Sequence, residues 1–316
     1  MALTVTAWCS ILVAIAASLT YVFLRTPTIA ISEYRGQWAV IAGASQGLGA
    51  AWADRLCREG VHVFLLARRS AALQDVAGTL RQYNTCLVDY HVHDLSAAEQ
   101  TKAANDILSS QHVDGSPRSF ALLVYVAAHT SPVGRFIDTP SVEIQYTTVD
   151  VNIRSVLAWT HTFLRHPPPP PPSDSPQPPK KGVVFMSSLV GGIGCGYVAN
   201  YAATKAWTTT FARALQYELR DQQQVDVLAC VAGATTTPTY LQLMGPHRDE
   251  MGESTPETVV SGCLAGLGNA AVVAPGWKNK LFQLLLWGIL PSDMVIQLAS
   301  DAMAPILRDR NTANPP

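Results

Sequence analysis

The sequence predicts an α/β fold with a single doubly wound parallel sheet of about seven strands. Two observations support this class of fold. Short apolar runs alternate with segments of helical character from about residue 36 to residue 275, and this alternation is typical of parallel strands joined by crossover helices. A glycine-rich turn also lies between the first strand and the first helix. With 316 residues, 48% of them apolar, the chain is long enough to bury one large core.

The charge and cysteine content narrow the class of protein. A net charge of -1 without a basic block gives no electrostatic case for binding nucleic acid. The cysteines are scattered without a CxxC pair, and the chain has no Asn-x-Ser/Thr acceptor, so both features favour a reducing compartment. The six cysteines are Cys9, Cys57, Cys86, Cys195, Cys230 and Cys263.

The N-terminal segment is predicted to be a membrane anchor. Ala7–Leu24 is eighteen residues long without a charge, about the minimum for a spanning helix. No basic residue precedes it, whereas Arg25 and Arg35 follow, so the body would face the cytosol. A cleaved secretory signal is the alternative, but the missing basic region and the length of the run disfavour it. We expect residues 1–30 to form a single-pass anchor and linker, with the endoplasmic reticulum as the default membrane.

The first strand is predicted over Gln37–Ala42, and the glycine turn follows it directly. Its GxxxGxG spacing allows a tight turn and lets the backbone approach a pyrophosphate at the positive end of the next helix, predicted over Ala50–Arg58. A dinucleotide would therefore contact the residues of this turn. They are Gly43, Ser45, Gln46, Gly47, Leu48 and Gly49.

The second strand is predicted over Val61–Leu66 and is followed by Ala67, Arg68 and Arg69. Enzymes that use NAD usually place a carboxylate here for the ribose 2'-hydroxyl, whereas two guanidinium groups suit a 2'-phosphate. The sequence thus favours NADP(H) as the cofactor. The alternative, that both arginines are simply solvated at the start of a helix, stays open.

The third strand is predicted over Leu87–Val92, with Asp94 and Leu95 just beyond it. A carboxylate at such a strand end is well placed to meet the adenine amine. His91 and His93 would share one face of the strand, as a metal pair does. No further ligand follows at suitable spacing, so we predict no metal site.

A helix over Ala97–Ser109 and a fourth strand over Phe120–Val126 come next. Ala127 at the end of that strand leaves room for a cofactor to lie against the backbone. The following helix, predicted over Ser141–Leu164, contains Asn152. Asparagine is a poor helix former, which suggests a role such as binding a water that relays protons. An exposed asparagine without a role is the alternative.

The fifth strand, predicted from Val183 to Met186, leads through a serine pair and a glycine-rich loop into a helix with Tyr201 and Lys205. Residues four apart lie on one face of a helix, so the ammonium would lie beside the phenol and favour the phenolate. Tyr201 could then give a proton to a carbonyl or take one from an alcohol. Ser188 could donate a hydrogen bond to the same oxygen. The alternative is a buried tyrosine packed by an exposed lysine.

A proline-rich insertion separates the fourth helix from the fifth strand. Residues 167–179 contain nine prolines, six of them consecutive, so this segment can form neither a helix nor an inner strand. It falls within one domain. We expect a solvated polyproline arm, with docking to an SH3- or WW-type partner as the alternative.

The last part of the domain is expected to complete the site. A sixth strand is predicted over Val225–Val231, and the hydroxyls of Thr235 and Thr237 beyond it could reach the nicotinamide amide. The segment Thr239–Ser254 is expected to line or cover the substrate. A helix start at Thr255-Pro256-Glu257 and a seventh strand over Ala271–Ala274 follow.

The C-terminal extension, residues 278–316, begins with an apolar run over Leu281–Leu290 that is too short to span a bilayer. Two interpretations are open. The run packs in the core or in a dimer interface, or it lies on the membrane near the access route of the substrate.

The combined motifs resemble the short-chain dehydrogenase/reductase family, with residues 31–277 as its Rossmann-like catalytic domain. The resemblance implies that Tyr201 is the acid/base, that Lys205 holds the ribose and lowers the tyrosine pKa, and that Ser188 orients the carbonyl. It further implies that Asn152 maintains a water relay and that the chain forms a homodimer. The residues that carry the resemblance are Gly43, Gly47, Gly49, Asp94, Asn152, Ser188, Tyr201 and Lys205.

Three departures from the family pattern concern the sheet and the cofactor edge. Ala42 replaces a threonine, Tyr125-Val126-Ala127-Ala128 replaces Asn-Asn-Ala-Gly, and Ala232-Gly233 replaces Pro-Gly. With its anchor, the chain is also similar to membrane-bound 3-ketodihydrosphingosine reductases, very-long-chain 3-oxoacyl reductases and microsomal steroid dehydrogenases. We therefore expect an NADPH-dependent enzyme of lipid metabolism that reduces a ketone or aldehyde, or oxidises the alcohol, of a lipophilic substrate. A catalytically weak nucleotide-binding adaptor that recruits partners through its proline arm is the alternative.

Overall fold

The computed structural model describes residues 31–112, 115, 117–167, 180–222, 225–245 and 252–313. The predicted anchor at Ala7–Leu24 lies outside these residues, as does the proline-rich insertion from residue 168 to residue 179. Across the described ranges, no helix combines the length and the apolar character that crossing a bilayer requires.

The strands of the described chain form one fully parallel seven-stranded sheet in the order β3-β2-β1-β4-β5-β6-β7. The predicted fold class is confirmed. The chain reverses its direction of winding between β3 and β4, so the carboxyl ends of β1 and β4 flank the crevice where such sheets bind ligands. The strands are β1 (Trp38–Ala42), β2 (His62–Ala67), β3 (Val88–Val92), β4 (Phe120–Tyr125), β5 (Lys181–Ser188), β6 (Val225–Ala232) and β7 (Val272–Val273).

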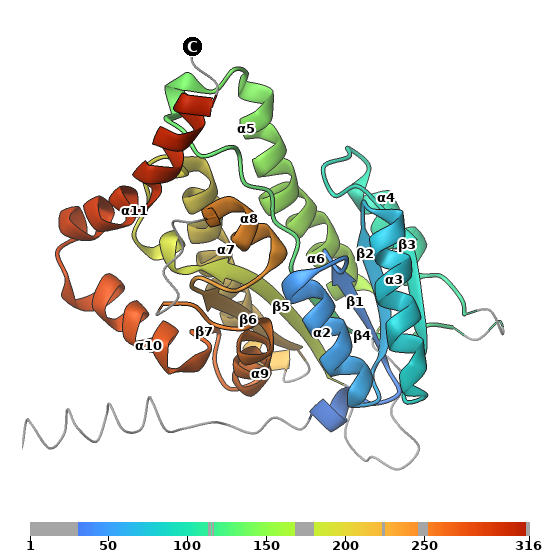
Figure 1. Cartoon of the computed structure of the whole chain (residues 1–316). Coiled ribbons are helices and arrows are strands. Elements are labelled where there is room, and N and C mark those ends of the chain that lie inside the picture. The colour runs from blue at the N-terminus through green and yellow to red at the C-terminus, as the bar shows by residue number, and fades with distance from the viewer. Residues whose placement is uncertain are drawn as a thin grey trace, which may run out of the picture.

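Helices cover both faces of the sheet (Figure 1). Alternate strand residues point to opposite faces, so Ala39 and Ile41 of β1 pack in one core cluster and Val40 and Ala42 in the other. The inner strands β1 and β4 are therefore apolar along their whole length, as parallel strands buried on both sides are, whereas β5 begins with a lysine and ends with two serines. One face carries α2 (Gly47–Arg58), α3 (Ser70–Leu80) and α9 (Pro256–Gly266); the other carries α4 (Gln100–Leu108), α6 (Ser155–Arg165) and α7 (Ala199–Leu219).

The helix predicted over Ser141–Leu164 is present but is not a regular α-helix throughout. It consists of α5 (Val142–Val149), a π-helical turn η4 (Asp150–Arg154) and α6. A π-helical turn inside an α-helix often marks a functional site. Here it contains Asn152, one of the four predicted catalytic residues.

The two ends of the proline-rich insertion are held together by Lys181. This lysine is 4% exposed, and its ammonium donates to the Phe163 carbonyl oxygen (2.8 Å) and to the His166 carbonyl oxygen at the end of α6. A lysine that bonds the last carbonyls of a helix also complements the helix dipole. The residues on either side of the insertion, His166 and Lys181, are thus bonded to each other.

Four of the six cysteines are paired, which the sequence did not predict. Cys57 of α2 is joined to Cys86, and Cys230 of β6 is joined to Cys263 of α9. The paired cysteines are 29 and 33 residues apart in the chain, so no short spacing motif predicts either pair. The spacing of the cysteines therefore carries no inference about the compartment, because scattered cysteines can meet in the fold, and a reducing compartment stays a prediction.

The C-terminal extension forms helices on the flank of the sheet beyond β7 (Figure 1). It consists of α10 (Gly276–Leu284), the π-helical turn η8 (Leu285–Ile289) and α11 (Ser292–Ala313). None of the residues in the apolar run 281–290 is buried. The interpretation of this run as core is therefore wrong.

Candidate active site

The carboxyl end of β5 brings together three of the four predicted catalytic residues. Ser188 is the last residue of β5, and Tyr201 and Lys205 lie one turn apart near the start of α7. The hydroxyls of Tyr201 and Ser188 share a hydrogen bond. The Lys205 ammonium lies 5.5 Å from the centre of the Tyr201 ring and donates to the Met186 carbonyl oxygen (2.7 Å).

The protonation of this pair differs from the sequence-based expectation. Burial raises the pKa of Tyr201 to about 12, although the hydrogen bond with Ser188 acts in the opposite direction. Burial lowers the pKa of Lys205 to about 8. In the chain alone, removal of the phenolate from water is the main influence on the tyrosine pKa, and the effect of the ammonium in the cofactor-bound site stays a prediction.

The structure also distinguishes the two adjacent serines of β5. Ser187 points toward α7, where its hydroxyl donates to the Lys205 carbonyl oxygen (2.9 Å) and bonds the Thr209 hydroxyl (2.7 Å). Ser188 points the other way, as the next residue of a strand must. Ser187 therefore holds the helix that carries Lys205, and Ser188 is the serine beside the phenol.

Asn152 is 2% exposed, so the alternative of an idle exposed asparagine was wrong. Its side-chain oxygen accepts from the His129 backbone N–H (2.8 Å), and its amide donates to the His129 carbonyl oxygen (2.9 Å) and the Thr204 hydroxyl (3.0 Å). These bonds connect the segment after β4 to the residue that precedes Lys205. Asn152 thus positions the loop after β4 through the His129 backbone, and α7 through the Thr204 hydroxyl. These bonds do not include Lys205 itself.

Tyr125, one of the departures from the family pattern, supports this arrangement. Its hydroxyl donates to the Val151 carbonyl oxygen (2.8 Å) and bonds the Ser155 hydroxyl (2.6 Å). Both partners flank Asn152 in the chain. Tyr125 therefore connects the end of β4 to the π-helical turn, so the sheet is supported at this point despite the substitution.

The glycine turn between β1 and α2 has the geometry that a phosphate-binding loop requires. Gly43 adopts φ +90°, and a Cβ there would lie 2.7 Å from the Ala127 backbone nitrogen. A Cβ on Gly49 would lie 2.1 Å from the Gly43 carbonyl oxygen. Gln46, which precedes α2, makes no side-chain capping bond, so the first N–H groups of the helix are not bonded by that side chain. Such groups bind anions.

Arg69 reaches back from α3 to this turn. Its guanidinium donates to the Ser45 hydroxyl (3.2 Å) and to the Gln46 side-chain oxygen (2.6 Å). Gln46 in turn donates to the Thr239 hydroxyl (2.8 Å). Arg68 and Arg69 are both exposed, so the alternative that they are solvated at the start of a helix stays open, although Arg69 is bonded. The guanidinium lies over the predicted phosphate turn.

Asp94 and Arg68 lie on the adenine side of the predicted cofactor site. Partial burial acts to raise the pKa of Asp94, but two hydrogen bonds from Ser96 and the nearby Arg68 charge lower it below its ordinary value. The carboxyl is therefore an anion that can accept from an amine. Leu95 beside it is buried, at 5% exposed.

The two predicted threonines lie beyond β6 but are already bonded. The Thr235 hydroxyl donates to the Gly233 carbonyl oxygen (3.1 Å), and the Thr237 hydroxyl accepts from the Tyr240 N–H (3.2 Å), which caps α8 (Pro238–Met244). Asn279 of α10, fully buried, accepts from the Gly233 N–H (3.2 Å). The C-terminal extension thus holds the loop where the sequence placed the nicotinamide.

An apolar wall lies beside Tyr201. It joins the loop after β4, the glycine-rich loop after β5, α8 and α11 in one cluster, and Tyr201 and Tyr240 pack against it. Thr239–Met244, expected to line or cover the substrate, supplies Tyr240 and Met244. The buried members of the cluster are Val133, Cys195, Val198, Ala202, Met244 and Ile306.

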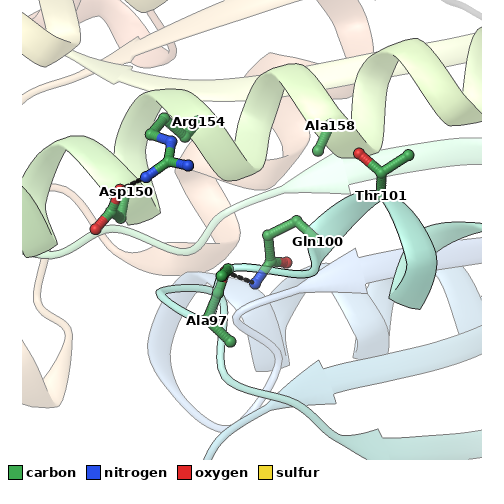
Figure 2. Close-up of a pocket in the computed structure, with 7 residues that line it drawn as sticks. Ala97, Gln100, Thr101, Asp150, Arg154 and Ala158 are labelled. Carbon is green, nitrogen blue, oxygen red and sulfur yellow. Dashed lines mark hydrogen bonds and ion pairs between the residues drawn. The ribbon is translucent and has the colours of Figure 1, made fainter.

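Two further features do not belong to the candidate site. His93 bonds the Gln100 side-chain oxygen (2.9 Å), and within the described ranges no three metal-ligand side chains lie together. Figure 2 shows a cavity of about 150 Å³ between α4 and the helix formed by η4 and α6. None of the predicted site residues lines it. The lining residues are Ala97, Ala98, Gln100, Thr101, Asp150, Arg154 and Ala158.

The family model for short chain dehydrogenases matches residues 37–244, which include the glycine turn and the Ser188, Tyr201 and Lys205 cluster. The chain belongs to the short-chain dehydrogenase family. The match ends at the end of α8, so the helices α10 and α11 lie outside the part that the family model covers.

Two curated relatives illustrate the range of this family. A very-long-chain 3-oxoacyl-CoA reductase of Laccaria bicolor is 30% identical over 202 residues, 64% of this chain and 56% of the relative. This short-chain dehydrogenase therefore spans little more than half the length of that relative. A 7beta-hydroxysteroid dehydrogenase of Mediterraneibacter gnavus is 27% identical over 256 residues, 79% of this chain and 90% of the relative.

Solved structures of the family share the fold. A 7beta-hydroxysteroid dehydrogenase structure superimposes with a TM-score of 0.71 at 23% identity, over 86% of this chain and 99% of the other. A short-chain dehydrogenase of Escherichia coli CFT073, solved with NADPH, superimposes with a TM-score of 0.62 at 21% identity, over 77% and 98% of the two chains. At these identities the likeness shows the fold alone.

Sequence reasoning missed several residues that hold the site. Ser187, Thr204 and Tyr125 act by bonding neighbours of the predicted residues, and Asn279 and Trp287 act from the C-terminal extension. Their partners are distant in the chain, and the bonds they make are ordinary ones that any polar residue can form. The only available signal was polarity within apolar surroundings, which Ser187 and Tyr125 show at the ends of their strands.

Proposed function

We propose that this short-chain dehydrogenase reduces a ketone or aldehyde of a lipophilic substrate with NADPH. The observation that carries the proposal is the cluster of Tyr201, Ser188 and Lys205 at the carboxyl edge of the sheet. This edge is shared with the glycine turn before α2, so one extended dinucleotide could reach both.

The residues of the turn fit a dinucleotide. Gly43 and Gly49 leave no room for a side chain against Ala127 and against the Gly43 carbonyl oxygen, so the backbone itself faces the crevice. NADPH would be held there by the amino end of α2, by Asp94 on the adenine side and by Lys205 at the nicotinamide ribose. The bound cofactor supplies hydride chemistry at the carbonyl carbon.

The chain's own residues supply the proton and orient the carbonyl. Because burial raises the pKa of Tyr201 to about 12, its phenol is protonated at neutral pH and can donate to the substrate oxygen. Ser188 can donate a second hydrogen bond to that oxygen. Oxidation of the alcohol would run through the same groups in reverse, with Tyr201 taking the proton that it gives in the reduction.

Two arginines favour NADPH over NADH. Arg69 lies over the turn through its bonds to Ser45 and Gln46. The charge of Arg68 helps to lower the pKa of Asp94. No carboxylate follows β2 directly. The NADPH-bound family member with the same fold is consistent with this preference.

The lipophilic character of the substrate is supported by the apolar wall beside Tyr201. Val133, Val198 and Met244 are already buried by the protein itself, at 3% to 7% exposed, so the wall gives Tyr201 apolar surroundings without itself facing solvent. The relatives that act on very-long-chain acyl groups and on steroids are named for substrates of this character.

Oxidation of NADPH by the detergent-solubilised chain tests the proposal. With sphingoid, acyl-CoA, steroid and retinoid carbonyls offered in parallel, we expect turnover with at least one class. We also expect a preference for NADPH over NADH that Arg69→Ala reduces, whereas Arg165→Ala on the far end of α6 leaves it unchanged. Absence of turnover with every class, although NADPH binds, would contradict the proposed activity.

We expect kcat/KM for the reduction to fall as pH rises through about 8. Burial lowers the pKa of Lys205 to about 8. Above this pH the side chain loses the positive charge that would hold the ribose and support proton transfer, and kcat/KM reports the free enzyme. A profile of kcat/KM from neutral to alkaline pH measures this decrease, which is the alkaline limb of the profile.

Lys181 is a matched control for that profile. Burial also lowers its pKa to about 8, but it lies at the start of β5, at the opposite end from Ser188. Lys181→Gln should leave the alkaline limb in place, whereas Lys205→Arg should move it upward because a guanidinium stays charged. If the decrease of kcat/KM above about pH 8 disappeared in Lys181→Gln, the decrease would come from Lys181, and its assignment to Lys205 would be wrong.

We further propose that Ala7–Leu24 anchors the chain in the endoplasmic reticulum with the catalytic body in the cytosol. The uncharged run and the arginines that follow it support this orientation. The paired cysteines make it testable, since disulfides are typical of oxidising compartments. Protease added to sealed microsomes should digest the body. A protected body with intact disulfides would show that the orientation is the reverse.

A further inference from the structure

The outer surface of the C-terminal extension is unusually apolar. Eight of the eighteen large hydrophobic side chains that the described chain exposes lie between residues 277 and 298. Monomeric soluble proteins rarely expose a contiguous apolar patch of this kind without a partner. We call these residues the C-terminal platform: Trp277, Leu281, Phe282, Leu284, Ile289, Met294, Ile296 and Leu298.

The platform is the outer side of helices whose inner side is already packed. Val295 is fully buried, and Ala299, Met303 and Ile306 contact the apolar wall beside Tyr201. An amphipathic helix that packs on one face normally presents polar residues on the other. In α11 the outward positions include Met294 and Leu298, at 49% and 50% exposed.

We propose that the C-terminal platform rests on the surface of a phospholipid bilayer. The distribution of charge supports a lipid surface. Residues 281–292 contain no charged side chain; Lys280 and Lys278, whose ammonium donates to the Glu253 carbonyl oxygen, precede them, and the exposed Asp293 follows. A segment that lies in the headgroup region has this composition, with apolar and tryptophan side chains in the acyl boundary and lysines at the rim.

The length of chain before the described residues supports the same partner. Leu24 ends the uncharged N-terminal run, and the described chain begins at Ile31, seven residues later. Seven extended residues span at most about 25 Å. If that run is anchored in a bilayer, a tether this short keeps the body against the lipid, and the platform is the most apolar flank available to face it.

The C-terminal extension that carries the platform is also bonded to the loop between Ser188 and Tyr201, through residues outside the platform itself. The Trp287 indole donates to the Leu189 carbonyl oxygen (2.9 Å), and a Cβ on Gly192 would lie 1.9 Å from the Trp287 ring. The Ser300 hydroxyl accepts from the Gly196 N–H (2.8 Å). Bilayer contact at the platform would therefore place lipid beside the catalytic loop. If the proposed function holds, this position shortens the path that a membrane-dissolved substrate takes to Tyr201.

Photochemical labelling of the full chain tests the platform without any measurement of activity. The chain is reconstituted in phosphatidylcholine vesicles that contain a phospholipid with a diazirine in its acyl chain, and the labelled peptides are mapped. We expect adducts within 277–298. The segment 136–146 is an internal control, since Phe136, Ile137 and Tyr146 are 58% to 76% exposed and lie outside the C-terminal extension.

A double variant makes the test specific. Phe282→Glu with Ile289→Glu places two charges on the platform, and neither side chain is buried, so folding should be retained by circular dichroism. We expect loss of the adducts within 277–298, whereas Ile137→Glu should leave them unchanged. If the proposed function holds, the double variant should also raise KM for a membrane-dissolved carbonyl and not for a water-soluble one.

Three outcomes would overturn the proposal. Adducts confined to residues 1–30 would show that the anchor alone meets the lipid. Equal labelling of 136–146 would show that the reagent reports exposure only. A stable dimer in light scattering that dissociates in the Phe282→Glu, Ile289→Glu variant would assign the platform to a second copy of the chain.

Discussion

Replacement of Tyr201 by phenylalanine is expected to abolish turnover and to leave NADPH binding largely intact. The substitution keeps the ring, which packs against the apolar wall and lies 5.5 Å from the Lys205 ammonium. It removes only the hydroxyl that bonds Ser188. Loss of a general acid typically costs about 10²- to 10⁴-fold in rate. Steady-state kcat together with an NADPH fluorescence titration measures both parts.

Tyr217→Phe is the matched control for this variant. Tyr217 lies on the same helix α7 but is 64% exposed and remote from Ser188, so its turnover should equal that of the unmodified chain. A Tyr201→Phe variant that turns over normally would refute the assignment of the acid. NADPH binding without turnover in the unmodified chain would instead favour the adaptor alternative, for which residues 167–179 remain the expected docking arm.

Gly49→Ala is expected to weaken NADPH binding strongly and to lower the free energy of unfolding. The new Cβ would lie 2.1 Å from the Gly43 carbonyl oxygen and 2.9 Å from the Ala44 Cα. Both are backbone atoms, so the turn itself must move. Overpacking of this kind costs about 1–3 kcal/mol or more, and each 1.4 kcal/mol expressed in binding is about tenfold in Kd. An NADPH titration and a thermal unfolding curve measure the two effects.

Gly78→Ala provides the control for that substitution. Gly78 lies in α3, and a Cβ there meets nothing within 4 Å. Alanine is the better helix former by roughly 0.5–1 kcal/mol, so this variant should unfold at a higher temperature and bind NADPH normally. If Gly49→Ala behaved in the same way, the glycine turn would not be the phosphate site.

The elements of the fold could be predicted closely because their signals are local. The apolar run Gln37–Ala42 became β1 at Trp38–Ala42, and the run Phe120–Val126 became β4 at Phe120–Tyr125. The end of each element follows from nearby glycines, prolines and charges. The π-helical turn at Asp150–Arg154 had no such signal, because the bond from Tyr125 to the Val151 carbonyl oxygen comes from another strand.

The candidate site was predicted in part. Ser188, Tyr201 and Lys205 do meet, because a strand end and the first turns of the next helix are close in both sequence and space. Asn152 was expected to serve Lys205 through water, but its side chain is bonded to His129 and Thr204. Thr237 was expected at the nicotinamide, which stays a prediction; in the chain alone its hydroxyl caps α8. Each of these polar side chains has several possible hydrogen-bond partners, and tertiary packing determines which partner it meets.

The sequence by itself determined the chemical groups and their local spacing. The helical period puts Tyr201 and Lys205 on one face, and the alternation of a strand separates Ser187 from Ser188. Tertiary structure alone decided the Tyr201 pKa, the pairing of Cys230 with Cys263 and the bond of Trp287 to Leu189, 98 residues away. The reason is physical: periodicity depends on neighbours in the chain, whereas desolvation and long-range bonds depend on which segments exclude water together.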